Sequence, residues 1–159
     1  MSRIGNVFIK EEKLKNKQFL YNYNYGRNER GFIINRISAI FKPSACKKRG
    51  MWPDITKQRI WELLLIHVQD MKEKFPESDG RICTYCEQPW TYRPGDGTAE
   101  NTVVNKRNFS IDRFDNALTY SEKNIVFCCT ECNDAKHSVP LRLIKKIYKM
   151  MEERNYEME

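Results

Sequence analysis

The sequence predicts an α+β fold with short strands, several helices and a site for structural zinc. Two C-x-x-C pairs, one beginning at Cys83 and one at Cys129, supply the thiols that bind zinc in reducing compartments. Short apolar segments at 109–114 and 124–128 have the length and composition of strands. Apolar residues recur at helical spacing over 56–74, which predicts a well-buried helix with Asp54 or Thr56 as its N-cap.

The length and the hydropathy pattern limit the classes of protein that fit. A chain of 159 residues suits one domain, or one small domain with an extended arm. No apolar run reaches the roughly 18 residues that a transmembrane helix needs, and the start lacks the apolar stretch of a secretory signal. We therefore expect an intracellular protein (cytoplasmic, in a bacterium or in a phage- or virus-infected cell) with no membrane partner, whose cysteines are thiols or metal ligands.

Positive charge is concentrated in the first third of the chain. Residues 1–50 contain 12 Lys and Arg against 3 Asp and Glu, whereas residues 51–159 contain 16 against 18. A basic arm beside a near-neutral body is typical of a protein with a polyanionic partner, although a solvated basic tail is the alternative. We therefore divide the chain into a nucleic-acid-binding basic arm and helix over 1–50, and a helix plus zinc-knuckle domain with a C-terminal helix over 51–159.

The basic arm predicts a short strand and then a basic helix. Tyrosines and asparagines alternate over 21–25, which predicts a strand that Gly26 and Gly31 would end. Apolar residues at helical spacing predict a helix over 33–49, which Pro43 breaks or kinks. Four basic side chains of this helix are candidate nucleic-acid contacts: Arg36, Lys47, Lys48 and Arg49.

The second half of the chain predicts the order strand, strand, helix. A helix should begin near Thr130, directly after the second strand. A last helix over about 140–154 should carry apolar residues on one face and basic residues on the other. The second cysteine knuckle therefore lies at the base of the first of these two helices.

The cysteine spacing defines the expected zinc ligands as Cys83, Cys86, Cys129 and Cys132. Each knuckle places two thiolates on one tight turn, and tetrahedral zinc needs four ligands. Cys128 should point away from Cys129 if it ends a strand, and pairing of Cys128 with Cys132 is the alternative. The 42 residues between the knuckles are long enough to hold a functional insert.

Three segments in this order, S-I-D-R-F-D-N, Y-S-E-K-N-I-V and C-x-x-C-N-x-x-K, resemble the HNH, or ββα-metal, endonuclease family in its zinc-knuckle form. The resemblance covers about residues 81–140. It implies a ββα-metal (HNH, His-Me finger) core around the zinc, flanked by helices and the basic arm. It also implies an endodeoxyribonuclease, a hydrolase that cleaves phosphodiester bonds in double-stranded DNA with Mg²⁺, for which Mn²⁺ could substitute.

The same resemblance implies roles for individual residues. Asp112 and Asn133 would hold the catalytic Mg²⁺, because carboxylate and amide oxygens suit this hard cation. Asn124 would tie down the loop between the two strands. Lys136 corresponds to the helix lysine of the family, which would contact the backbone or a phosphate.

Arg113 stands where the family usually has its catalytic histidine. A guanidinium stays charged at neutral pH and cannot accept a proton, but it can hold a phosphate oxygen. The resemblance is therefore to a less common Asp-Arg branch, found in some rare-cutting restriction enzymes, in which a tyrosine follows. That tyrosine is Tyr120, preceded here by Thr119 rather than the usual glycine. Three proton acceptors remain open: Tyr120, His137 and metal-bound water.

Restriction, homing or mobile-element, and phage roles all agree with these features. Cleavage of both strands would require a homodimer, because one ββα site cleaves one strand at a time. The alternative interpretation is a catalytically inactive, zinc-stabilised nucleic-acid-binding module, in which Arg113 marks the loss of catalysis. A zinc module for protein contacts is a third interpretation, which the basic arm makes less suitable.

Overall fold

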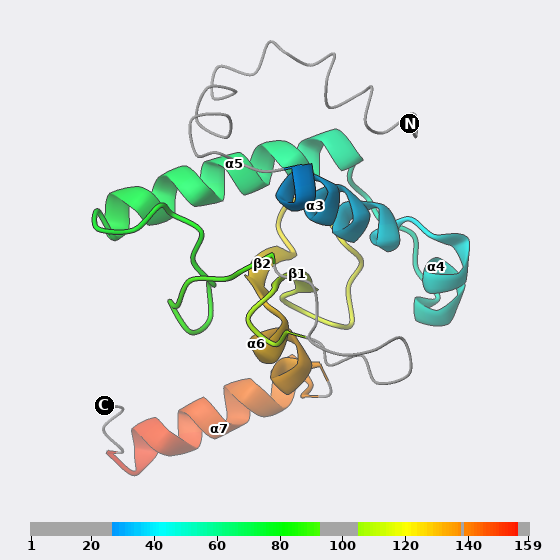
Figure 1. Cartoon of the computed structure of the whole chain (residues 1–159). Coiled ribbons are helices and arrows are strands. Elements are labelled where there is room, and N and C mark those ends of the chain that lie inside the picture. Colours follow the sequence, from blue (N-terminus) through cyan, green and yellow to red (C-terminus); the bar gives the residue numbers. More distant parts are fainter. Residues whose placement is uncertain (1–26, 93–104, 138, 156–159) are drawn as a thin grey trace.

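The protein has a mixed α+β fold with one two-stranded sheet. The computed structural model describes residues 27–92, 105–137 and 139–155. The elements in chain order are α3 (Arg27–Ile40), α4 (Pro43–Arg49), α5 (Lys57–Lys74), β1 (Phe109–Arg113), β2 (Ile125–Cys129), α6 (Thr130–Lys136) and α7 (Leu141–Glu153). Figure 1 shows α3 and α5 on one side of the strands and α6 and α7 on the other. The strand expected at 21–25 lies outside the described residues.

The sheet confirms the two predicted strands to within one residue at each end. β1 and β2 pair antiparallel, and the register sets Ser110 opposite Cys128 and Asp112 opposite Val126. Since side chains alternate along a strand, Ser110 and Asp112 share one face of β1 while Phe109 and Ile111 share the other. All four are buried, so both faces of β1 are covered.

One hydrophobic core joins α3, α5 and the sheet. Ile33 and Ile37 of α3 lie in the same cluster as Ile60 and Leu64 of α5 and as Phe109 of β1. The core therefore extends across residue 50, the expected boundary between the arm and the body. The predicted cap of α5 is confirmed at Thr56, whose hydroxyl accepts a hydrogen bond from the Arg59 N–H at 3.1 Å.

The predicted break at Pro43 is confirmed, because α3 ends at Ile40 and α4 begins at Pro43. Proline has no N–H to donate and is tolerated only in the first turn of a helix. The expectation that Gly31 ends a strand was wrong, since Gly31 lies inside α3. α3 begins four residues before Gly31, at Arg27, and its Ile33 and Ile37 pack in the core. This packing outweighs the weak helix propensity of glycine.

α7 differs from the other helices because none of its residues is buried. Figure 1 shows it extending from the end of α6, away from α3 and α5. None of the helices in the described ranges combines the length with the apolar character that crossing a bilayer requires.

Candidate functional site

The four thiols of the two knuckles converge on one point, as the sequence predicts. The sulfurs of Cys83, Cys86, Cys129 and Cys132 all lie within 4.8 Å of one another, and those of Cys86 and Cys129 are 4.0 Å apart. A tetrahedral zinc bound at about 2.3 Å separates its sulfur ligands by about 3.8 Å. The thiol cluster, as we call these four residues, therefore has the donors and the spacing to hold a metal ion such as zinc.

Backbone contacts to the core position the first knuckle. The N–H and the hydroxyl of Thr84 both donate to the Phe127 carbonyl of β2, at 3.1 and 2.8 Å. Gly80, three residues before Cys83, has φ +83°, and a Cβ there would lie 2.0 Å from the Val68 carbonyl oxygen. Only glycine allows this close approach to α5, so Gly80 fixes the direction in which the chain enters the knuckle.

Cys128 does not belong to the thiol cluster. Its sulfur lies 3.7 Å from the Ser110 carbonyl oxygen, across the sheet. Burial raises the pKa of its thiol, with the nearby Asp112 charge acting in the same direction. The expectation that Cys128 points away from Cys129 is thus confirmed, and the alternative pairing of Cys128 with Cys132 is not formed.

Arg107 supplies positive charge beside the thiol cluster. Its Nη1 lies 3.3 Å from the Cys129 sulfur and 3.7 Å from the Cys86 sulfur, and its Nη2 donates to the Pro89 carbonyl at 2.8 Å. Burial opposes ionisation of Cys86, but the backbone N–H of Gln88 and the Arg107 guanidinium outweigh it and lower the pKa of that thiol to about 7. A four-thiolate zinc site has a net negative charge, and Arg107 offsets part of it.

Asp112 lies in a polar cluster on the face of β1 that α6 covers. Its side chain is 6% exposed, and its Oδ2 accepts from the Tyr85 hydroxyl at 2.7 Å and from the Lys136 ammonium at 2.9 Å. Burial and the hydrogen bond to Asp112 raise the pKa of Tyr85, so this phenol stays protonated. Tyr85 belongs to the first knuckle, so it links the thiol cluster directly to Asp112.

Asn133 contacts the neighbouring residue of the same sheet face. Its side-chain amide is hydrogen-bonded to the Ser110 hydroxyl at 2.8 Å. One turn later on α6, Lys136 reaches Asp112 and also donates to the Arg113 carbonyl at 2.6 Å. The structure thus brings both expected magnesium ligands to one face of β1, and it places the Lys136 ammonium on the carboxylate.

Asn124 holds the loop between β1 and β2, as expected for this position. It is 4% exposed, and its Oδ1 accepts from the Asp115 N–H at 2.8 Å. Its Nδ2 donates to the Asp115 carbonyl at 3.0 Å and to the Thr119 carbonyl at 2.9 Å. Since these bonds satisfy a buried amide on both sides, the loop that carries Asp115 and Tyr120 is held to the start of β2.

Arg113 and Tyr120 form a second group on the other side of Asp112. The Arg113 guanidinium lies 5.6 Å from the centre of the Tyr120 ring and donates to the Leu118 carbonyl at 3.0 Å. Arg49 lies 5.2 Å from the centre of the same ring. Burial nevertheless raises the pKa of Tyr120, although both guanidinium groups act in the opposite direction. A proton acceptor would need a lowered pKa, so this environment disfavours Tyr120 in that role.

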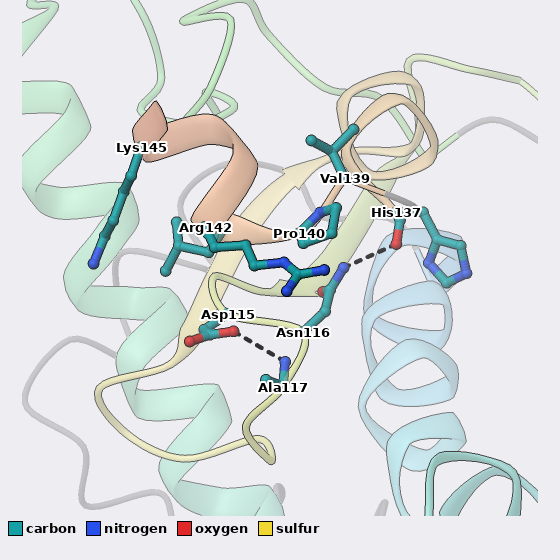
Figure 2. A pocket seen from close by; sticks show the side chains of 9 residues that line it. Asp115, Asn116, Ala117, His137, Val139, Pro140, Arg142 and Lys145 are labelled. Atoms are coloured by element: carbon teal, nitrogen blue, oxygen red, sulfur yellow. Dashed lines mark hydrogen bonds between the residues drawn. The ribbon is translucent and has the colours of Figure 1, made fainter. Parts of the chain in front are cut away.

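His137 lies at the rim of a separate pocket of about 610 Å³. Figure 2 shows Asp115 and Asn116 from the loop after β1, and Arg142 and Lys145 from α7, around this pocket. The Asn116 amide donates to the His137 carbonyl at 2.9 Å and ties the end of α6 to the loop. His137 thus contacts this loop through its backbone carbonyl, and the residue is exposed.

The predicted nucleic-acid contacts lie in different environments. Lys47 and Lys48 are exposed at the end of α4, where they can meet a phosphate. Arg36 lies over the Phe32 ring at 5.1 Å. Arg49 instead donates to the Ile40 carbonyl at 2.6 Å and ties α4 to the end of α3. Lys136 makes the backbone contact that was one of its two expected roles, and its side chain is 12% exposed.

Three polar residues of these sites were not predicted from the sequence: Tyr85, Arg107 and Ser110. Tyr85 stands inside a recognised motif, C-T-Y-C, but nothing in the motif indicates that its hydroxyl reaches β1. Arg107 lies in a turn and belongs to no periodic pattern. Ser110 lies two residues before Asp112, and the alternation of β1 was the available signal that they share a face.

Comparison of the chain with protein-family models, with curated proteins and with solved structures gave no match.

Proposed function

We propose that this protein is a metal-dependent endonuclease of the HNH, or ββα-metal, type that hydrolyses phosphodiester bonds in double-stranded DNA. The observation that carries the proposal is the position of Asp112. This carboxylate lies on the first of two antiparallel strands, under a helix that begins in the second cysteine knuckle. The second strand ends and the helix begins in this knuckle, so a bound metal would give the buried carboxylate and its polar neighbours a rigid support.

In this proposal the thiol cluster holds zinc and has a structural role. Four thiolates fill a tetrahedral shell and leave no open position for a substrate, which is typical of structural rather than catalytic zinc. The first knuckle delivers Tyr85 to Asp112, and the second begins α6, which delivers Asn133 and Lys136. Zinc binding would therefore order the polar cluster from two sides.

Asp112 and Asn133 are the residues proposed to hold Mg²⁺. Their oxygens, with the neighbouring Ser110 hydroxyl, are the hard donors that this cation prefers. A bound Mg²⁺ would supply charge stabilisation for the phosphate and the leaving oxygen. The Lys136 ammonium lies 2.9 Å from Asp112 and would have to give way or share the carboxylate when the cation binds.

Arg113 is proposed to hold a phosphate oxygen of the DNA. Its guanidinium lies beside Tyr120 at the end of β1, and a second guanidinium, that of Arg49, faces the same ring. The permanent positive charge of Arg113 at this position suits a phosphate that carries negative charge in the transition state. Since burial raises the pKa of Tyr120, His137 or metal-bound water is the better candidate for the proton acceptor.

The test is cleavage of supercoiled plasmid by the zinc-loaded protein in Mg²⁺ or in Mn²⁺. Asp112→Asn alone leaves the Lys136 charge unpaired, so the informative variant is the double change Asp112→Asn with Lys136→Met. We expect this variant to fold, to retain zinc and DNA binding, and to lose cleavage. Cleavage at the wild-type rate by the folded double variant would contradict the proposal. End-sequencing of the products would then separate restriction-like from non-specific activity.

One observation favours a second candidate function, a nucleic-acid-binding zinc module without catalysis. The ion pair between Asp112 and Lys136 already neutralises the carboxylate within the protein, as in a site that has no cation to bind. Under this alternative Lys47 and Lys48 still bind a polyanion, while the wild-type protein leaves plasmid intact at every Mg²⁺ and Mn²⁺ concentration.

A further inference from the structure

The exposed face of α7 lies outside the proposed nuclease site and leads to a separate inference. None of its residues is buried, and it carries most of the large apolar side chains that are exposed in the second half of the described chain. These side chains are Leu143, Ile144, Ile147, Tyr148 and Met150. A contiguous apolar surface of this kind on one helix indicates a protein or membrane contact rather than ordinary surface.

The apolar and charged residues of α7 occupy opposite halves of the helix. At about 100° per residue, the apolar side chains fall on one side of the helix and the charged ones on the other. A helix of 13 residues is close to the length below which an isolated helix is only marginally stable in water. Since nothing in the described chain buries this face, a partner surface would complete the packing of α7.

The charges that border the apolar face follow a specific order along the helix. Lys145 and Lys146 are each followed seven residues later by an acidic residue, Glu152 and Glu153. Seven residues are close to two turns, so each lysine lies above its glutamate along the same edge. Lys149 approaches Glu153 at 4.0 Å, but both side chains are exposed, and such a pair contributes little to stability.

This order matches a second copy of the same helix that runs in the opposite direction. In an antiparallel pair the same edges of the two helices meet, so the lysines of one copy face the glutamates of the other. In a parallel pair lysine would face lysine and glutamate would face glutamate. The arrangement is self-complementary, as a two-fold symmetric interface requires.

We propose that α7 is a homodimer interface in which two copies pack antiparallel, apolar face against apolar face. Duplex DNA fits the proposal less well, because it would leave the apolar half of α7 in water. An anionic membrane would attract the four basic residues of α7 but would repel Glu152 and Glu153, which border its apolar face. The interface does not depend on whether the protein cleaves DNA.

The first test is sedimentation velocity of the full-length, zinc-loaded chain over a dilution series. We expect a dimer, and we expect Ile147→Asp to weaken dimerisation by about a hundredfold or more, because it buries an unpaired carboxylate in the interface. The matched control is Ile66→Asp on α5, since Ile66 and Ile147 are 44% and 46% exposed. This control should remain dimeric, and zinc content and circular dichroism should show that both variants fold.

Charge reversal tests the antiparallel direction. We expect Lys145→Glu with Lys146→Glu to be monomeric, and Glu152→Lys with Glu153→Lys to be monomeric, whereas all four changes together should restore the dimer. A wild-type chain that stays monomeric at every concentration would overturn the proposal. This holds also if the N-terminal residues of the same chain, or anionic phospholipid vesicles, are then found to cover α7. The proposal would also be overturned if Ile147→Asp remained dimeric, or if both double charge reversals left the dimer unchanged.

Discussion

The thiol cluster and the Asp112 cluster lie next to each other but are built in opposite ways. In the thiol cluster, four sulfur atoms lie close together with no basic side chain of the described residues between them, although Arg107 lies beside two of them. In the second, one buried carboxylate already has an ammonium and a phenol hydroxyl as partners. The first therefore has the donors for a metal ion such as zinc, whereas the second is satisfied by the protein itself. This difference separates a site that supports the fold from a site that is proposed to act in catalysis.

The largest effect should come from the thiol cluster. Cys83→Ser should abolish zinc binding and unfold the domain, because structural zinc supplies on the order of 10 kcal/mol in small zinc domains, which is comparable to the stability of a whole domain. The matched control is Cys128→Ser, a buried cysteine outside the cluster. Elemental analysis and thermal unfolding should show that the control retains zinc and that Cys83→Ser does not. A folded, zinc-free Cys83→Ser protein would remove the distinction between the two sites.

A smaller effect should come from breaking the buried ion pair. Asp112→Asn leaves the Lys136 ammonium without its carboxylate, which should cost about 3–5 kcal/mol of unfolding free energy. Lys136→Met leaves the carboxylate unpaired instead, and the double variant removes both charges and should recover most of the loss. Chemical denaturation of the wild type and the three variants gives the coupling energy. Additive losses would mean that the pair contributes nothing to the fold.

A still smaller effect should come from removal of the positive charge of Arg107 beside the thiols. Arg107→Met should lower zinc affinity about tenfold to a hundredfold. This range is typical of residues that contact the metal ligands but do not bind the metal themselves. The domain should remain folded at saturating zinc, because the four thiols are unchanged. Competition with a chromophoric chelator measures the affinity. Arg107→Lys, which retains the charge but not the two-pronged geometry, should fall between the wild type and Arg107→Met.

The smallest effects on stability should come from the candidate proton acceptors. Tyr120→Phe and His137→Ala should each change the unfolding free energy by less than about 1 kcal/mol, since neither leaves a known buried partner unsatisfied. Their cleavage rates should differ: the raised pKa of Tyr120 predicts little loss for Tyr120→Phe. Single-turnover cleavage compares the two variants. A large loss in Tyr120→Phe with none in His137→Ala would reverse our assignment.

The sequence-based predictions that were confirmed concern features whose interactions lie within a few residues along the chain. The knuckles, the break at Pro43, the cap at Thr56 and the strands of the sheet follow from spacing and turn chemistry within a few residues. The α+β class and the grouping of the four thiols were confirmed for this reason. The clamp at Asn124 also lies close in sequence to the loop that it holds.

The missed features depend on contacts between distant segments. Tyr85 meets Asp112 because the first knuckle folds over the sheet, and no periodic pattern encodes that approach. Arg49 was expected to contact a phosphate, but its guanidinium donates a hydrogen bond to the Ile40 carbonyl at the end of α3. The faces of α7 were predicted correctly, yet an amphipathic pattern does not state what covers the apolar side.

Titration calorimetry of Mg²⁺ or Mn²⁺ into the zinc-loaded protein tests most directly whether Asp112 belongs to a cation site. We predict binding to the wild type and none to Asp112→Asn with Lys136→Met. Binding to Lys136→Met should be about tenfold tighter or more, because nearby like charges repel by several kcal/mol in a partly buried site. Absence of binding to all three proteins, or equal binding to all three, would contradict these predictions.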